Sequence, residues 1–478
     1  MAGKPVGRAD YLAAYLKRRE AENKNTLLVH AGDMVGASAP VSALLQDEPT
    51  IEILNRLGFD VGTVGNHEFD EGVDELLRLV QGGYHEKTGW FEGATFPYVC
   101  ANVVDRDTGK PILPSYVIKR VNGMPIGFVG VVTTETPRIV MPSAVATVRF
   151  LDEAEAINRA AAELKEKGVR AIVVLAHVPG AQLGVTGEPY GEVVELARKI
   201  DDEVDVIFAG HSHAYLNAVV DGKLIVQAYA YGTAFADVDL AIDPRTKDVV
   251  AKRAEIVTTF HEGMAPDPEI RRMIEEYEER VAPIVNRVVG TATHAITREQ
   301  NESGESALGN LIADAQRQAM QTDFAFLNPG GIRADLDAGD VTWGELYTIQ
   351  PFNNTLVRMT LTGEQIRRLL NQQWQENAVR MLQVSGLRYT WDAARPVGDR
   401  VVDIFRADGT PLDPQGRYTV TVNSFLAEGG DGFTVLRDGT DRVYGPEDIE
   451  ALVTYIERLP QPFSAAIEGR IQRVNSRR

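Results

Sequence analysis

The chain has 478 residues, which is too long for one hydrophobic core, so two or more domains are expected. Its net charge of −19 argues against polymeric nucleic acid as a ligand, because such binding needs a basic face, whereas a small phosphorylated substrate stays compatible. The single cysteine, Cys100, excludes an internal disulfide framework, and no apolar run reaches the roughly 18 residues that a membrane-spanning helix needs.

The first half of the chain alternates predicted helices and strands. The periodicity of apolar residues predicts helices over residues 9–20, 51–57 and 153–167. Short apolar runs predict strands over residues 26–29, 59–64, 125–132, 171–176 and 204–209. Strands that alternate with helices predict a layered α/β domain.

A charged amphipathic helix is predicted over residues 269–281, with opposite charges four residues apart. The same pattern is typical of any solvated surface helix, but its position predicts a linker between two domains. A second α/β-type segment follows, with glycine-rich turns at residues 328–331 and 429–432.

Four polar segments each follow an apolar run in the first half. They are His30-Ala-Gly-Asp33, Asn66-His-Glu-Phe-Asp70, His177 and His211-Ser-His213. Taken singly, the acidic and amide residues are typical of turns and the histidines of hydrogen-bonded structural positions. Together, their carboxylate, amide and imidazole groups form the mixed set that binds divalent metals. The sequence therefore predicts a two-metal phosphoesterase centre.

His67 and Asp70 are predicted to form a separate catalytic pair. Their i, i+3 spacing on a helical turn would allow a hydrogen bond, and a carboxylate on one imidazole nitrogen fixes the tautomer and favours the cation. Such a histidine can stabilise developing phosphate charge or protonate a leaving oxygen. The alternative is that Asp70 only caps the helix after it.

These segments resemble the calcineurin-like metallophosphoesterases, and nearly the whole chain resembles the 5′-nucleotidase family. That family includes UDP-sugar hydrolases and 2′,3′-cyclic-nucleotide phosphodiesterases. The resemblance implies an α/β fold with a four-layer αββα domain at residues 1–265. It also implies a linker helix at 266–289 and a C-terminal α+β substrate-binding domain at 290–478.

The resemblance also implies roles for the polar residues. Asp33 would bridge two divalent ions (Mn, Zn, Co or Mg), Asn66, His177 and His211 would complete the second ion, and His213 would bind the first. The family pattern begins with a strand that ends in Asp-x-His, which this chain lacks before residue 9. The first ion would then keep only Asp33 and His213, and the sequence is expected to start late, without the signal peptide of an exported periplasmic or extracellular protein.

The second half carries the predicted substrate residues. Residues 328–333 look like the family's Asn-x-Gly-x-x-Arg loop, and two phenylalanines look like its stacking pair, whose rings could hold a nucleobase. Asp438 is the candidate for holding the ribose hydroxyls. The candidates are Asn328, Gly331, Arg333, Phe352, Phe433 and Asp438. An acidic residue, Glu302, stands where many relatives place an arginine.

The predicted function is metal-dependent hydrolysis of nucleoside 5′-monophosphates to nucleoside and phosphate. The alternatives on the same scaffold are a 2′,3′-cyclic-nucleotide phosphodiesterase/3′-nucleotidase, a UDP-sugar hydrolase or a thiosulfate-ester hydrolase. An inactive nucleotide-binding protein is a further alternative, because the first metal motif is missing. The expected partner is a nucleotide substrate.

Overall fold

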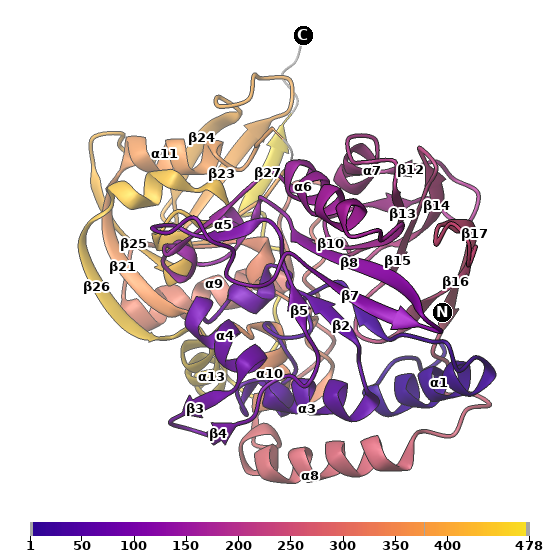
Figure 1. Cartoon of the computed structure of the whole chain (residues 1–478). Coiled ribbons are helices and arrows are strands. Elements are labelled where there is room, and N and C mark those ends of the chain that lie inside the picture. Colours follow the sequence, from indigo (N-terminus) through magenta and orange to yellow (C-terminus); the bar gives the residue numbers. More distant parts are fainter. Residues whose placement is uncertain (1–2, 377, 475–478) are drawn as a thin grey trace. The chain divides into compact units, whose positions relative to one another are not determined.

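The computed structural model describes residues 3–376 and 378–474. The chain forms two compact units, and the main boundary between them falls between Arg280 and Val281. Figure 1 follows the chain through both units. None of the described helices combines the length and the apolar character that crossing a bilayer requires.

Unit 1 is built on two larger sheets whose strands are mostly parallel. The smaller sheet has the order β1 (Val29–His30), β2 (Val61–Thr63), β5 (Tyr98–Val99). The larger sheet has the order β14 (Tyr215–Val220), β15 (Lys223–Ala228), β13 (Val204–Ala209), β10 (Ala171–His177), β8 (Met124–Val132), β7 (Tyr116–Val121). The pairs β8–β10, β10–β13 and β13–β15 are parallel, whereas β14 and β7 close the edges as antiparallel strands.

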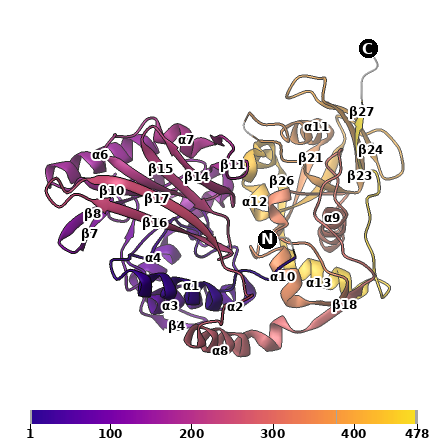
Figure 2. The ribbon, with the colours of Figure 1, turned by 90° about the vertical axis from the view of Figure 1, so that its right-hand side faces the viewer.

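Three hydrophobic clusters arrange these sheets into four layers. One cluster lies between the small sheet and α3 (Glu48–Leu57) and α4 (Val73–Gln81), and a second lies between the two sheets. A third lies between the large sheet and α6 (Glu153–Glu166) and α7 (Glu192–Ala197). Figure 2 shows α6 and α7 on one side of the strands, and α1 (Ala9–Glu22) and α3 on the other. The predicted αββα arrangement is therefore confirmed.

The remaining elements of unit 1 are short, apart from one long hairpin. The hairpin pairs β16 (Ala234–Ile242) with β17 (Val249–Thr258). The short strands are β3 (Gly83–His85), β4 (Gly89–Phe91), β6 (Val103–Asp105), β9 (Val148–Phe150), β11 (Ala181–Gln182) and β12 (Pro189–Tyr190). The short helices are α2 (Pro40–Ala43) and α5 (Thr136–Ile139).

Most of the predicted elements occur within a few residues of their expected bounds. The strand predicted at 26–29 is shorter, because the Leu28 N–H donates to the Asp60 side chain instead of to a neighbouring strand. The helix predicted at 153–167 is α6, and Asp152 caps it by accepting a hydrogen bond from the Glu155 N–H at 2.9 Å. The charged helix is α8 (Pro268–Val285), and the boundary between the units falls inside it.

Unit 2 is built on a five-stranded mixed sheet. Its order is β22 (Gln383–Ser385), β19 (Phe324–Leu327), β25 (Arg417–Asn423), β21 (Thr355–Thr362), β26 (Thr440–Glu447). The main core lies between this sheet, α11 (Gly363–Asn371) and a three-stranded sheet of β24 (Val401–Arg406), β23 (Leu387–Asp392) and β27 (Ile471–Val474). A small cluster joins β21 to α9 (Ala307–Met320) and α13 (Asp448–Arg458). The other elements are β18 (Val288–Ala292), β20 (Gly339–Thr342), α10 (Trp343–Ile349) and α12 (Ser424–Ala427).

Candidate metal centre

The predicted metal ligands lie in loops that follow parallel strands of unit 1. His177 is the last residue of β10, and His211 follows β13 after one glycine. Asp33 and Asn66 follow β1 and β2 by three residues each. The backbone of Asp33 (φ 53°) and His211 (φ 72°) is left-handed, a conformation that costs of the order of 1–3 kcal/mol and is concentrated at functional sites.

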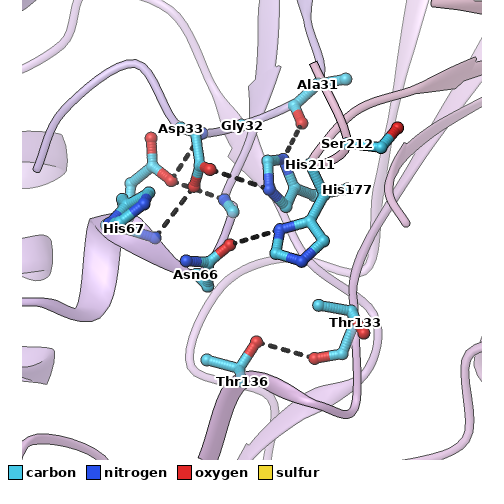
Figure 3. Close-up of polar contacts among 12 residues, drawn as sticks. Ala31, Gly32, Asp33, Asn66, His67, Thr133, Thr136, His177, His211 and Ser212 are labelled. Carbon is cyan, nitrogen blue, oxygen red and sulfur yellow. Dashed lines mark hydrogen bonds and ion pairs between the residues drawn. The ribbon is translucent and has the colours of Figure 1, made fainter. Parts of the chain in front are cut away.

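Three of these side chains converge tightly. The candidate ligand atoms of Asp33, His177 and His211 all lie within 4.8 Å of one another. Asn66 joins them, because its Oδ1 lies 2.9 Å from His211 Nδ1. Figure 3 shows these four side chains pointing toward one another. Their oxygen and nitrogen atoms are the donor set that divalent ions prefer.

His177 has the tautomer and orientation of a metal ligand. Its Nδ1 lies 2.7 Å from the Ala31 carbonyl oxygen, so Nδ1 carries the proton that this bond needs and Nε2 keeps its lone pair. Nε2 is buried 2.9 Å from Asp33 Oδ2 and makes no hydrogen bond of good geometry with any described residue. A buried imidazole nitrogen aimed at a carboxylate in this way fits a metal ion between them.

The electrostatics of the centre favour ionised carboxylate and neutral His211. Burial, with the nearby His177, lowers the pKa of His211 to about 4, which leaves its ring nitrogen available at neutral pH. Burial alone would raise the pKa of Asp33, but the His177 and His67 rings and the His67 N–H hold it below its usual range. Burial would likewise lower the pKa of His177, but the Asp33 carboxylate outweighs it and raises that pKa.

Gly65 is required by the close packing of the centre. A Cβ at this position would lie 2.1 Å from Asp33 Oδ1 and 2.7 Å from His177 Cε1, so any side chain would displace the ligands. The glycine between β2 and Asn66 therefore serves the metal centre directly.

Glu68 is a residue that the sequence analysis did not single out. Its buried carboxylate accepts hydrogen bonds from the backbone N–H groups of Gly65 (2.5 Å), Asp33 (2.9 Å) and Met34 (2.8 Å). It thus ties the Asp33 loop to the Asn66 loop. Burial and the Asp33 charge raise the pKa of Glu68 to about 7, opposed by the Gly65 and Met34 N–H groups. Its position one residue after His67, in a turn between two buried segments, was the available signal.

The His67–Asp70 pair is present beside this group. His67 Nδ1 lies 2.8 Å from Asp70 Oδ2, which orients the ring and directs Nε2 to the opposite side. The His67 N–H also donates to Asp33 Oδ1 at 2.9 Å, so the pair is fixed to the candidate bridging carboxylate. The geometry fits a histidine that stabilises or protonates a group held near Asp33.

The other two histidines of the four segments differ from these ligands. His213 (φ 54°) is exposed, lies outside the group around Asp33, and contacts the Tyr231 ring edge-on at a centroid distance of 5.3 Å. His30 is buried against the rings of Phe59, Phe96 and Tyr98, and burial lowers its pKa to about 3. His30 is therefore a core histidine.

The predicted substrate loop of unit 2 forms a polar cluster. Asn328 Nδ2 donates to Asp431 Oδ2 at 2.8 Å, and Asn328 Oδ1 accepts from Asn423 Nδ2 at 3.1 Å. Gly331 lies against Asn328, because a Cβ there would be 3.1 Å from Asn328 Oδ1. The Arg333 guanidinium lies over the half-buried Phe352 ring, 5.9 Å from its centroid.

Two of the predicted residues in unit 2 lie elsewhere. Phe433 is fully buried in the main core of unit 2, so its ring has no exposed face on which a base could stack. Phe425 is half-buried instead and packs directly on Gly430, next to Asp431. Asp438 is exposed at the end of a 3₁₀ turn, whereas Asp431 contacts Asn328. The Gly429-Gly430-Asp431 turn itself was the signal for Phe425 and Asp431.

Comparisons with known proteins identify the family of the chain. Residues 5–215 match the calcineurin-like phosphoesterase family, and residues 288–438 match the 5′-nucleotidase C-terminal domain. A 5′-nucleotidase precursor from Thermus thermophilus superposes with a TM-score of 0.84 at 33% identity, covering 99% of this chain and 95% of that one.

Two curated relatives are similar along almost the whole chain but are themselves longer. The endonuclease YhcR of Bacillus subtilis is 49% identical over 98% of this chain, and a cell wall protein of Listeria monocytogenes is 38% identical over 95%. The chain spans only 38% and 64% of their respective lengths. With both domain families matched and a solved 5′-nucleotidase covered nearly end to end, the chain belongs to the calcineurin-like phosphoesterases that carry a 5′-nucleotidase C-terminal domain.

Proposed function

We propose that the protein hydrolyses nucleoside 5′-monophosphates to nucleoside and phosphate with divalent metal at the centre of unit 1. The observation that carries the proposal is the convergence of Asp33, Asn66, His177 and His211, with the buried His177 Nε2 aimed at Asp33 Oδ2 from 2.9 Å. The family uses divalent metals. The geometry does not support the first predicted ion, between Asp33 and His213, because His213 lies outside the group around Asp33.

A divalent ion held there would act as a Lewis acid on a phosphoryl oxygen and make a water nucleophilic at neutral pH. The chain's own groups supply the rest. His67, oriented by Asp70, would stabilise charge on the phosphoryl oxygens or protonate the leaving oxygen from Nε2. Glu68 and Gly65 keep the Asp33 and Asn66 loops close together.

Unit 2 would bind the nucleoside. Arg333 can hold phosphate oxygens, and the half-buried rings of Phe352 and Phe425 replace the predicted Phe352–Phe433 pair as candidates for base stacking. Asp431, which Asn328 orients, replaces Asp438 as the acceptor for ribose hydroxyls.

A phosphodiester is the second candidate substrate, because the relative that is 49% identical is named an endonuclease. The 2′,3′-cyclic-nucleotide phosphodiesterase alternative belongs to the same chemistry. The similarity to a cell wall protein supports our proposal that the protein acts outside the cytoplasm, in the periplasm or the extracellular space.

Phosphate release from AMP with added Mn²⁺ or Co²⁺ tests the proposal, and 2′,3′-cyclic AMP and bis-p-nitrophenyl phosphate should be assayed in parallel. We expect metal-dependent release that the His67→Ala variant loses while it still binds metal. Metal analysis of the wild type should find one to two ions per chain. The absence of bound metal, or release no faster than that of His67→Ala on every ester, would refute the proposal.

A further inference from the structure

Two exposed tyrosines lie next to the loop that carries His211 and His213. Tyr231 is 74% exposed and Tyr229 is 37% exposed. The Tyr231 ring contacts His213 at a centroid distance of 5.3 Å, and the Tyr229 ring contacts Tyr215 at 6.1 Å. We call the rings of Tyr229 and Tyr231 the tyrosine platform.

The backbone holds the tyrosine platform in an unfavourable conformation. Tyr229 (φ 56°) and Tyr231 (φ 58°) are both left-handed, which for a bulky residue is an outlier that costs roughly 1–2 kcal/mol. The Tyr229 N–H donates to the Ala214 carbonyl oxygen at 3.1 Å, and the Thr233 N–H closes a turn on the Ala230 carbonyl oxygen at 3.1 Å. Because exposed rings repay little of this strain by burial, a binding role explains the arrangement better than a structural one.

The tyrosine platform lies among segments without charged residues, and this indicates the kind of ligand that it can bind. The segments 211–215 and 229–233 contain no aspartate, glutamate, lysine or arginine. An uncharged aromatic surface does not attract a phosphate group, but it does stack on a nucleobase, whose flat face every base presents. Tyr231 contacts His213, which follows the candidate ligand His211 by two residues, so a base stacked on the platform would lie next to the loop that carries His211.

We propose that the tyrosine platform stacks on the nucleobase of a second nucleoside, so that the centre accepts phosphodiesters that link two nucleosides. This inference rests on the proposed phosphoesterase function. In the step, the oxygen of water bonds to phosphorus, the bond from phosphorus to one nucleoside oxygen breaks, and that oxygen takes a proton. The products are one nucleoside and one nucleoside monophosphate.

The test compares two diesters of AMP, one esterified with a second nucleoside and one with a methyl group. These are the dinucleotide adenylyl-adenosine and the methyl ester of AMP, both assayed with Mn²⁺. Stacking predicts that kcat/KM for the dinucleotide exceeds that for the methyl ester by about 5- to 150-fold in the wild type. Tyr231→Ala should abolish the excess and Tyr231→Phe should keep it. Tyr84→Ala, which removes a 69% exposed ring on β3, is the matched control and should change nothing.

Calorimetric titration with a non-hydrolysable phosphorothioate dinucleotide gives a second readout that does not need turnover. Tyr231→Ala should raise the Kd of this dinucleotide by the same factor and leave unchanged the Kd of the phosphorothioate methyl ester, measured in the same way. Equal kcat/KM for the two diesters in the wild type, or a preference for the dinucleotide that survives Tyr231→Ala, would overturn the inference. In that case AMP hydrolysis would persist, whereas failure of the proposed function would abolish hydrolysis of every ester.

Discussion

Replacing Glu68 by glutamine should damage the metal centre without touching a candidate ligand. The Glu68 carboxylate accepts three backbone N–H groups, from Gly65, Asp33 and Met34. Oε2 takes the first two and Oε1 takes the third. Glutamine has the same shape, but only one of its two terminal atoms can accept.

The cost follows from this geometry. If the remaining side-chain oxygen still accepts from the Gly65 and Asp33 N–H groups, the new NH₂ group faces the Met34 N–H. Both of these groups are donors, so they cannot form a hydrogen bond. One charge-assisted bond is lost and one N–H is left unsatisfied, which together cost about 2–4 kcal/mol of unfolding free energy. Because the lost bond orients the residue next to Asp33, metal affinity should fall by about 10- to 100-fold, the range for partners that orient ligands.

The assay is metal titration by calorimetry together with chemical denaturation at pH 8, where Glu68 is ionised because its pKa is about 7. Glu163→Gln on the exposed face of α6 is the matched control, since among the described residues its carboxylate accepts only the Tyr116 hydroxyl, at 2.9 Å. We expect the control to change the metal affinity and the free energy of unfolding little. If Glu68→Gln binds metal and unfolds like the wild type, the role assigned to the three N–H bonds is wrong.

Three further outcomes follow from the structure. His67→Ala should lower kcat for AMP by about 10²- to 10⁴-fold with metal affinity kept, and a loss of metal binding would contradict the separate role of the pair. Phe425→Ala should raise KM for AMP about 5- to 150-fold but not KM for p-nitrophenyl phosphate, whereas Phe433→Ala should cost about 3–5 kcal/mol in denaturation; the reverse pattern would restore Phe433 as the stacking ring. Burial raises the pKa of Asp448 to about 7, above its unfolded value, so the stability it contributes is complete below about pH 4 and is lost as pH rises toward 7. The Tm of Asp448→Asn should therefore fall less between pH 5 and 8 than the Tm of the wild type, and equal slopes of Tm against pH would refute this.

The layered fold of unit 1 could be predicted because its signals are local. Apolar runs such as 171–176 and the alanine-rich helix 153–167 determine strand or helix within a few consecutive residues. The polar residues after these runs were predictable as a site for the same reason, since parallel strands bring their carboxyl ends to one edge.

The unpredicted features depend on contacts between distant segments. Whether Phe425 or Phe433 is exposed depends on how the turn at 429–432 packs, and both residues flank the same glycine-rich motif. Glu68 looks like one more acidic residue in a turn, and only the fold brings the Asp33 and Met34 N–H groups to it from 35 and 34 residues away, respectively. The hairpin of β16 and β17 was also absent from the predicted elements, although it pairs two consecutive strands.

The centre is therefore determined by backbone groups as much as by ligand side chains. The Ala31 carbonyl oxygen sets the tautomer of His177, the N–H groups of Asp33 and Met34 are fixed by Glu68, and Gly65 leaves space that a side chain would take from Asp33. A set of ligands copied onto another loop without these contacts would lack both the orientation and the tautomer that metal binding needs. The strain at Asp33 and His211 is consistent with this reading, because left-handed residues persist only where surrounding contacts hold them, and here those contacts are the ones that arrange the ligands.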